Sequence, residues 1–106
     1  MTSFGRHPEE SLRDLGRQAC ASALRDAGIH PSAVEAVYCA NALGLALQGE
    51  SGIGQSVAWE VGVHSVPIVN VENACASGST ALHQAWRDIA AGFHDVVLVI
   101  GVEKSV

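Results

Sequence analysis

Apolar residues recur every three or four positions near the start of the chain, which is typical of a helix with one buried face. The segment runs from Pro8 to Ile29 in "PEESLRDLGRQACASALRDAGI". Its predicted apolar stripe consists of Leu12, Leu15, Ala19, Ala23 and Ala27. Acidic residues crowd its beginning, where the helix dipole favours negative charge. Gly28 fits the left-handed position that follows a helix, and Pro31 prevents the helix from continuing.

Three later segments carry the apolar and β-branched residues that are typical of strands. They cover Ala36–Ala42, Val66–Val71 and Asp95–Glu103. We expect near-continuous burial of the second segment, because almost all of its residues are apolar. The third segment, "DVVLVIGVE", is apolar on both faces, so we expect a central strand with helices above and below it.

The stretches between these strands predict two further helices and one loop. "SVAWEVGV" predicts a short helix closed by Gly62, and Ala76–Ala91 predicts a long helix closed by Gly92. "GLALQGESGIGQ" contains four glycines and predicts a loop. That loop lacks the signatures of phosphate- and dinucleotide-binding loops. The alternation of helices and strands predicts an α/β fold with a mostly parallel sheet covered by helices and joined by right-handed crossovers.

Composition and charge exclude several classes of function. The 106 residues are 48% hydrophobic and 16% charged, which suits one small folded domain or part of a larger one. The net charge is −5 and the six basic residues are scattered, so we expect neither a nucleic-acid partner nor a membrane partner. The N-terminus has no apolar secretion signal, and the longest apolar run is too short to cross a bilayer. We therefore expect a cytoplasmic protein.

The histidines and cysteines narrow the candidate chemistry. No two of the five histidines have the i, i+4 spacing of a helical metal pair, so we expect no metal site. The three cysteines, Cys20, Cys39 and Cys75, are widely spaced and form no CxxC pair, which indicates reduced thiols. Cys20 and Cys39 lie in apolar segments, where we expect packed and inert side chains.

Cys75 is the candidate nucleophile. It stands between a predicted strand and a predicted helix in "VNVENACASGSTAL", residues 69–82. The unpaired N–H groups and the dipole of a helix N-terminus favour a thiolate, which is the nucleophilic form. Five small neighbours (Ala74, Ala76, Ser77, Gly78 and Ser79) leave room for a substrate's acyl group. The alternative is a small core residue, because small side chains at a helix start also allow tight packing against a sheet.

The same stretch resembles the nucleophile motif of the thiolase family, in which an Asn precedes the reactive Cys and a Ser-Gly pair follows it. "MTSFGRHPEESLRDLGRQACASALRDAGI" is similar to the beginning of sterol-carrier-type and related bacterial thiolases. "GQSVAWEVGVHSVPIVNVENACASG" and "HDVVLVIGVEKSV" resemble later segments of the same proteins. The resemblance implies that residues 1–106 form part of a thiolase N-terminal domain, with the first strand and the C-terminal half of the fold absent.

The resemblance also implies a reaction. Cys75 would take the acyl group of a 3-oxoacyl-CoA as a thioester and pass it to coenzyme A, or run the reverse Claisen condensation. The backbone N–H of Cys75 would stabilise the oxyanion, coenzyme A would be a substrate, and no separate cofactor is implied. The family's base histidine and second cysteine stand in "GHP" and "CxG" motifs that this sequence lacks. We therefore expect residues 1–106 alone to be inactive, and we interpret His83 and Trp86 as packing or interface residues.

Two alternatives and one partner prediction remain. The chain could be a non-catalytic thiolase-like piece with a role in assembly. It could also belong to a β-ketoacyl-synthase-type condensing enzyme, although "NACASGS" is closer to the thiolase turn. In thiolases the strand that leads to the Cys pairs across a two-fold axis, so the resemblance implies a homodimer or hetero-oligomer through Val66–Val71.

Overall fold

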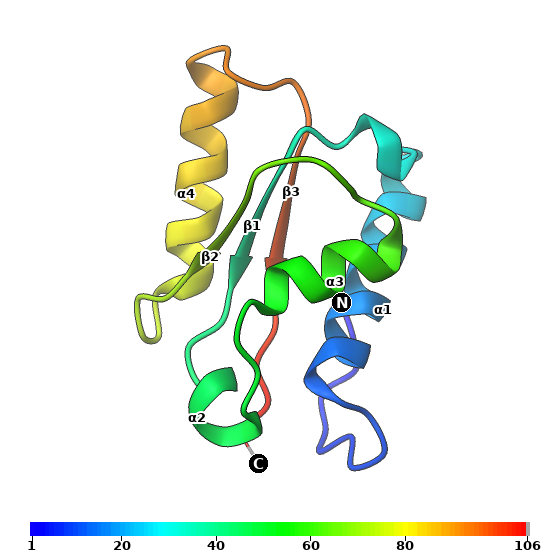
Figure 1. The fold of residues 1–106 in the computed structure, drawn as a ribbon, viewed down its shortest axis with the longest axis vertical. Helices are drawn as coiled ribbons and strands as arrows, with labels where there is room; N and C mark the ends of the chain where they lie inside the picture. Colours follow the sequence, from blue (N-terminus) through cyan, green and yellow to red (C-terminus); the bar gives the residue numbers. More distant parts are fainter. Residues whose placement is uncertain (106) are drawn as a thin grey trace.

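A computed structural model of the protein, which describes residues 1–105, contains a parallel sheet of three strands. The strand β1 (Ala36–Ala40) lies between β2 (Ile68–Val71) and β3 (Val97–Gly101), and its Val37 is in register with Ile68 and Leu98. The predicted parallel sheet is confirmed. Because the strands run in one direction, their carboxyl ends meet at one edge of the sheet (Figure 1).

Helices cover both faces of this sheet. The helix α4 (Ser77–Ala90) packs on one face, and α1 (Leu12–Ala27) and α3 (Ile53–Val61) lie on the other (Figure 1). The core beneath α1 and α3 is the larger and contains Leu12, Val37, Cys39, Val57, Val63 and Ile100. The core beneath α4 is small and contains Ala40, Val71 and Ala81. Alternate residues of β1 therefore enter opposite layers, as the pleat of a strand requires.

The first helix is confirmed, but part of its predicted buried face is wrong. Ser11 caps α1: its Oγ accepts a hydrogen bond from the Asp14 N–H at 3.1 Å, and Asp14 Oδ2 accepts one from the Ser11 N–H at 2.9 Å. Gly28 closes the helix in the left-handed conformation, with φ 67°. The buried face runs through Leu12, Leu15, Gly16, Cys20 and Leu24. Ala23 and Ala27 are exposed, because the buried face of the helix includes Gly16 and Cys20 instead.

The predicted loop of residues 44–55 is only partly a loop. The helix α2 (Gly44–Gln48) occupies its first half, and α3 begins at Ile53. Two of the four glycines, Gly49 and Gly52, have positive φ values of 69° and 61°. The other two lie in helices, and a Cβ on Gly54 would stand 2.8 Å from the Cβ of Cys39. Two of the four glycines thus allow close packing of a helix, and the other two allow positive φ values in a loop. The number of glycines in a segment does not distinguish these two roles.

Two predictions about the strands are wrong. The segment 95–103 was expected to give a central strand, but β3 lies at an edge of the sheet in residues 1–105, and β1 is central. The segment 66–71 was expected to be nearly buried throughout, but Val69 is 43% exposed and Asn70 is also exposed. The reason is the same for both strands: each has one strand neighbour in the described residues, and the α4 layer is a single helix wide.

Candidate active site

Cys75 lies in the turn between β2 and α4 and is exposed, whereas Cys20 and Cys39 are 2% and 0% exposed. The alternative that Cys75 is a small core residue is therefore wrong. The expected burial of the other two cysteines is confirmed. Burial raises the pKa of the Cys20 thiol to about 11 and that of the Cys39 thiol to about 12, so both stay protonated at neutral pH. Cys75 is the one exposed cysteine of the three.

A left-handed backbone at Ala74 sets the direction of the turn, with φ 48°. This conformation costs an L-residue about 1–2 kcal/mol, so the surrounding structure must hold it. Glu72 Oε2 accepts the Ala74 N–H at 2.6 Å. Ser77 Oγ accepts the Asn73 N–H at 2.8 Å and donates to the Ala74 carbonyl at 2.7 Å. These bonds tie the strained residue to both of its flanks.

The first turn of α4 is joined to the same loop. Asn73 Nδ2 donates to Thr80 Oγ1 at 3.0 Å, and that hydroxyl donates to the Ala76 carbonyl at 2.8 Å. The Ala76 N–H donates to the Asn73 carbonyl at 2.9 Å. Within residues 1–105, the backbone N–H of Cys75 has no hydrogen-bond acceptor. The turn is therefore held by its neighbours while the amide of Cys75 stays available to an oxyanion.

Cys75 lines a shallow depression of about 340 Å³ at the carboxyl edge of the sheet. The depression is lined by Ala40, Asn41, Ala74, Cys75, Ser77, Gly78, Gly101, Val102 and Glu103. These residues come from the ends of β1 and β3 and from the start of α4. In α/β sheets, ligands bind outside the carboxyl ends of the strands. The expected small residues beside Cys75, including Gly78, leave the thiol accessible.

Two lining residues, Asn41 and Glu103, were missed by sequence reasoning. Asn41 Nδ2 donates to the Val102 carbonyl at 2.8 Å and to Glu103 Oε1 at 3.2 Å. The Glu103 carboxylate also accepts the backbone N–H groups of Ala42 at 2.7 Å and Leu43 at 2.9 Å. The available signal was their position just beyond the ends of strands, where α/β proteins place functional groups: Asn41 directly follows β1, and Glu103 is the second residue after β3.

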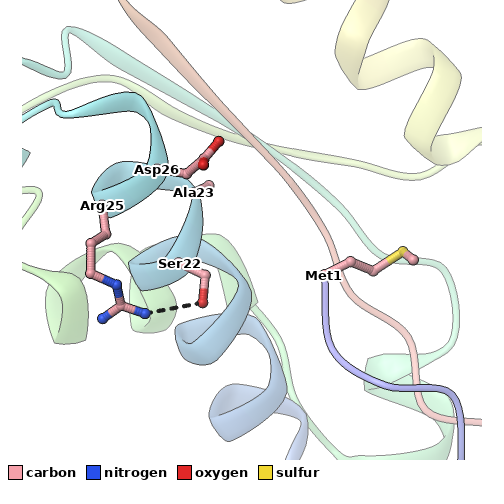
Figure 2. A pocket seen from close by; sticks show the side chains of 5 residues that line it. All are labelled: Met1, Ser22, Ala23, Arg25 and Asp26. Atoms are coloured by element: carbon pink, nitrogen blue, oxygen red, sulfur yellow. Dashed lines mark hydrogen bonds between the residues drawn. The ribbon is translucent and has the colours of Figure 1, made fainter.

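The other predicted residues lie apart from Cys75. His83 and Trp86 stack on one another on α4, with ring centroids 5.9 Å apart, and Trp86 is 63% exposed. A second depression lies beside the end of α1. There Arg25 Nη2 donates a hydrogen bond to Ser22 Oγ at 3.4 Å, and Met1 lies apart from both residues (Figure 2). Its side chains do not converge on a common point, so we assign it no chemistry.

The part of the chain that the structure describes, residues 1–105, contains no group of three or more His, Cys, Asp or Glu side chains that could hold a metal ion. None of its helices combines the length and the apolar character needed to cross a bilayer.

Comparison with known proteins gives the family. The model of the thiolase N-terminal domain family matches residues 1–105. The acetyl-CoA acetyltransferase of Methanocaldococcus jannaschii is 41% identical over 103 residues, which are 97% of this chain and 26% of that protein. Sterol carrier protein 2 of Gallus gallus is 39% identical over 107 residues, 98% of this chain and 19% of that protein. The structure of 3-oxoacyl-(acyl-carrier-protein) synthase III from Aquifex aeolicus superposes with a TM-score of 0.81 at 29% identity, over 91% of this chain and 30% of that chain.

The chain therefore belongs to the thiolase N-terminal domain family. The resemblance noted from the sequence and the predicted thiolase-like α/β fold are both confirmed. The chain spans about a quarter of the length of the acetyltransferase that it matches, 26%. The catalytic role of Cys75 stays a prediction, because these comparisons assign a family and no residue roles.

Proposed function

We propose that the chain carries the nucleophile of a thiolase-type acyl-CoA acyltransferase, and that Cys75 is the residue that holds the acyl group. The observation that carries this proposal is the exposed thiol in a depression at the carboxyl edge of the sheet. The free N–H of Cys75 supports a second role as an oxyanion donor. The name of the acetyl-CoA acetyltransferase relative supports acyl-CoA and coenzyme A as substrates.

The proposed reaction has two half-steps. The Cys75 thiolate attacks the β-carbonyl carbon of a 3-oxoacyl-CoA, the bond between the α- and β-carbons breaks, and the acyl group stays on Sγ. The acetyl-CoA carbanion that leaves takes a proton from an acid. The thiolate of coenzyme A then attacks the acyl thioester and releases the Cys75 thiolate. The reverse sequence is the Claisen condensation.

This reaction needs an acid and a base, which the resemblance to thiolases assigns to a histidine and a second cysteine. The lining of the depression around Cys75 contains neither of them among the described residues. We propose that both groups come from a region outside residues 1–106, as the resemblance to thiolases implies. We also propose that Val66–Val71 pairs with a second subunit, which is supported by the exposed Val69 on the edge strand β2.

The test is thiolysis of acetoacetyl-CoA by the full-length protein and its cysteine variants. Cys75→Ala should abolish acetyl-CoA formation, because no other exposed thiol is available in residues 1–105. Cys20→Ala is the matched control, since it removes a buried thiol and should retain activity. Thiolysis that survives Cys75→Ala would overturn the proposal.

One structural observation favours a second candidate, a condensing enzyme that uses an acyl carrier protein. The synthase III structure superposes with a TM-score of 0.81. The two candidates differ in what accepts the acyl group from Cys75. The acceptor is the thiolate of coenzyme A in thiolysis, and it is the α-carbon of a second acyl group, carried as a thioester on an acyl carrier protein, in the synthase. The sterol carrier protein 2 relative fits the non-catalytic alternative, which predicts no turnover with either acceptor.

A further inference from the structure

We propose that Asn41 and Glu103 form a positioning clamp for acyl transfer at Cys75. The inference rests on the proposed function and adds two residues that act on the floor of the depression without reacting themselves. Both line the depression beside Cys75, and Asn41 follows β1 while Glu103 follows β3.

The clamp joins the carboxyl ends of all three strands. The backbone N–H of Asn41 donates to the Val71 carbonyl at the end of β2, at 3.2 Å. Its Nδ2 donates to the Val102 carbonyl at 2.8 Å, and its Oδ1 accepts the Gly44 N–H at 3.0 Å. Asn41 therefore links β2, the end of β3 and the start of α2. Its side chain is partly buried, so these bonds are shielded from solvent on one side.

Glu103 braces the same segment from the other side. Its two carboxylate oxygens accept the Ala42 N–H, the Leu43 N–H and the Asn41 amide, at 2.7, 2.9 and 3.2 Å. Hydrogen bonds to a carboxylate are stronger than neutral ones. Three consecutive backbone N–H groups, at residues 42–44, are thus satisfied by the clamp. With these groups held, the segment that follows Asn41 cannot shift independently of the end of β3.

The clamp affects the reaction by fixing the position of the residues against which a bound substrate lies. A substrate that reaches Cys75 must lie in a depression whose lining includes Ala40, Asn41, Val102 and Glu103. A misplacement of about 1 Å in a reacting group can lower a rate by roughly 100-fold. Loosening the clamp should therefore slow attack on a bound acyl-CoA. It should leave attack on a small, freely diffusing reagent unchanged, because such a reagent needs no floor to position it.

The fold provides a matched control in Glu35, at the opposite ends of the same two strands. Glu35 precedes β1, and its Oε1 accepts the N–H groups of Asp95 at 2.9 Å and Val96 at 3.1 Å, just before β3. Glu35 and Glu103 are both exposed and both join β1 to β3 through backbone N–H groups. They differ in distance from the thiol, since Glu35 does not line the depression of Cys75.

The experiment compares Glu103→Gln with Glu35→Gln in the full-length protein. A Gln presents an amide N–H₂ where the carboxylate accepted N–H groups, so each variant loses hydrogen bonds at its own end of the sheet. Quenched mixing with acetyl-CoA followed by mass spectrometry gives the acetylation rate of Cys75. Iodoacetamide labelling gives the intrinsic reactivity of the thiol, and thermal unfolding gives the cost in stability.

We expect E103Q to lower the acetylation rate at saturating acetyl-CoA at least about tenfold, with iodoacetamide labelling unchanged. E35Q should lower stability but leave both rates unchanged. Asn41→Ser should also lower the acetylation rate without changing iodoacetamide labelling. It replaces E103Q in the comparison if E103Q does not fold. Equal acetylation rates in E103Q and E35Q would overturn the clamp alone, as would a parallel loss of labelling in E103Q. An unmodified Cys75 in the wild-type protein would overturn the proposed function and the clamp together.

Discussion

Ala74 determines where the candidate nucleophile points. Its φ of 48° reverses the chain between the end of β2 and the first turn of α4, and the next residue is Cys75. The bonds from Glu72 and Ser77 hold this conformation against its intrinsic cost. Strained backbone of this kind persists where surrounding contacts over-determine it, and it gathers at functional sites. The turn thus stores strain that presents the thiol to the depression.

Replacing Ala74 with Gly tests this strain. Glycine adopts positive φ without penalty, so Ala74→Gly should recover the roughly 1–2 kcal/mol that the left-handed conformation costs alanine. Ala76→Gly is the control, because Ala76 is also exposed but has a φ of −97°. Both variants carry the same entropic cost in the unfolded chain. We therefore expect A74G to be more stable than A76G by about 1–2 kcal/mol in urea unfolding; equal stabilities would contradict the account.

The two buried thiols should resist alkylation in the folded protein. Burial raises the pKa of Cys20 from 9.0 to about 11 and that of Cys39 from 9.0 to about 12. In the native protein at pH 8, iodoacetamide should label Cys75 and leave the other two unmodified until the protein unfolds. Because the folded-state values are raised, the stability from the neutral buried thiols is complete below pH 9.0 and is lost as the pH rises through about 11 and 12. Labelling of Cys39 in the folded protein would contradict this.

At the scale of elements, α1 and α3 meet at a glycine. A Cβ on Gly16 would stand 2.8 Å from Cγ2 of Val57, which is fully buried. Gly16 therefore lets the two helices approach closely over the larger core. Helix propensity alone would favour alanine here, so the packing and the local preference oppose one another.

Gly16→Ala should consequently destabilise the fold by about 1–3 kcal/mol, since overpacking displaces neighbouring side chains. Gly78→Ala in α4 is the control, because no atom beyond its chain neighbours and its own helix backbone lies within 4 Å of its Cβ position, and it should stabilise by up to about 1 kcal/mol. Adding Val57→Ala to G16A should cost less than the sum of the two single changes. Chemical unfolding of the four variants measures this, and strict additivity would rule out the proposed contact.

The sequence predicts single elements better than their arrangement. The spacing of apolar residues locates α1, and the glycine at position 28 marks its end, because both are local signals. The edge position of β3 depends on which strands are available to pair, and no apolar pattern within the segment records that. Cys75 could be predicted as the candidate nucleophile because its motif is contiguous in the chain. Glu103 was not, because its partners Ala42 and Leu43 lie 61 and 60 residues away.

At the scale of the whole molecule, large exposed apolar residues lie at several elements, and one group of them lies at the α4 layer. The layer of α4 carries four large exposed apolar residues, and the edge of β2 adds Val69; the four are Leu82, Trp86, Ile89 and Phe93. The larger core on the other face is covered by two helices (Figure 1). The asymmetry fits a chain that covers about a quarter of a longer relative, 26%.

The proposed pairing through β2 can be tested in the full-length protein by light scattering. Val69→Lys introduces a charge at the exposed edge strand and should convert dimers to monomers, because an edge lysine opposes strand pairing. Ala23→Lys, on the exposed side of α1, is the control and should leave the mass unchanged. A V69K protein that stays dimeric would show that the pairing lies elsewhere.

The most direct measurement is the mass of the full-length protein after brief mixing with acetyl-CoA and acid quenching. We expect one acetyl group, located on the peptide that contains Cys75, and we expect it to disappear when coenzyme A is added before the quench. Cys20 and Cys39 should remain unmodified, because both are buried. A protein that catalyses thiolysis while Cys75 never carries an acyl group would contradict the central claim.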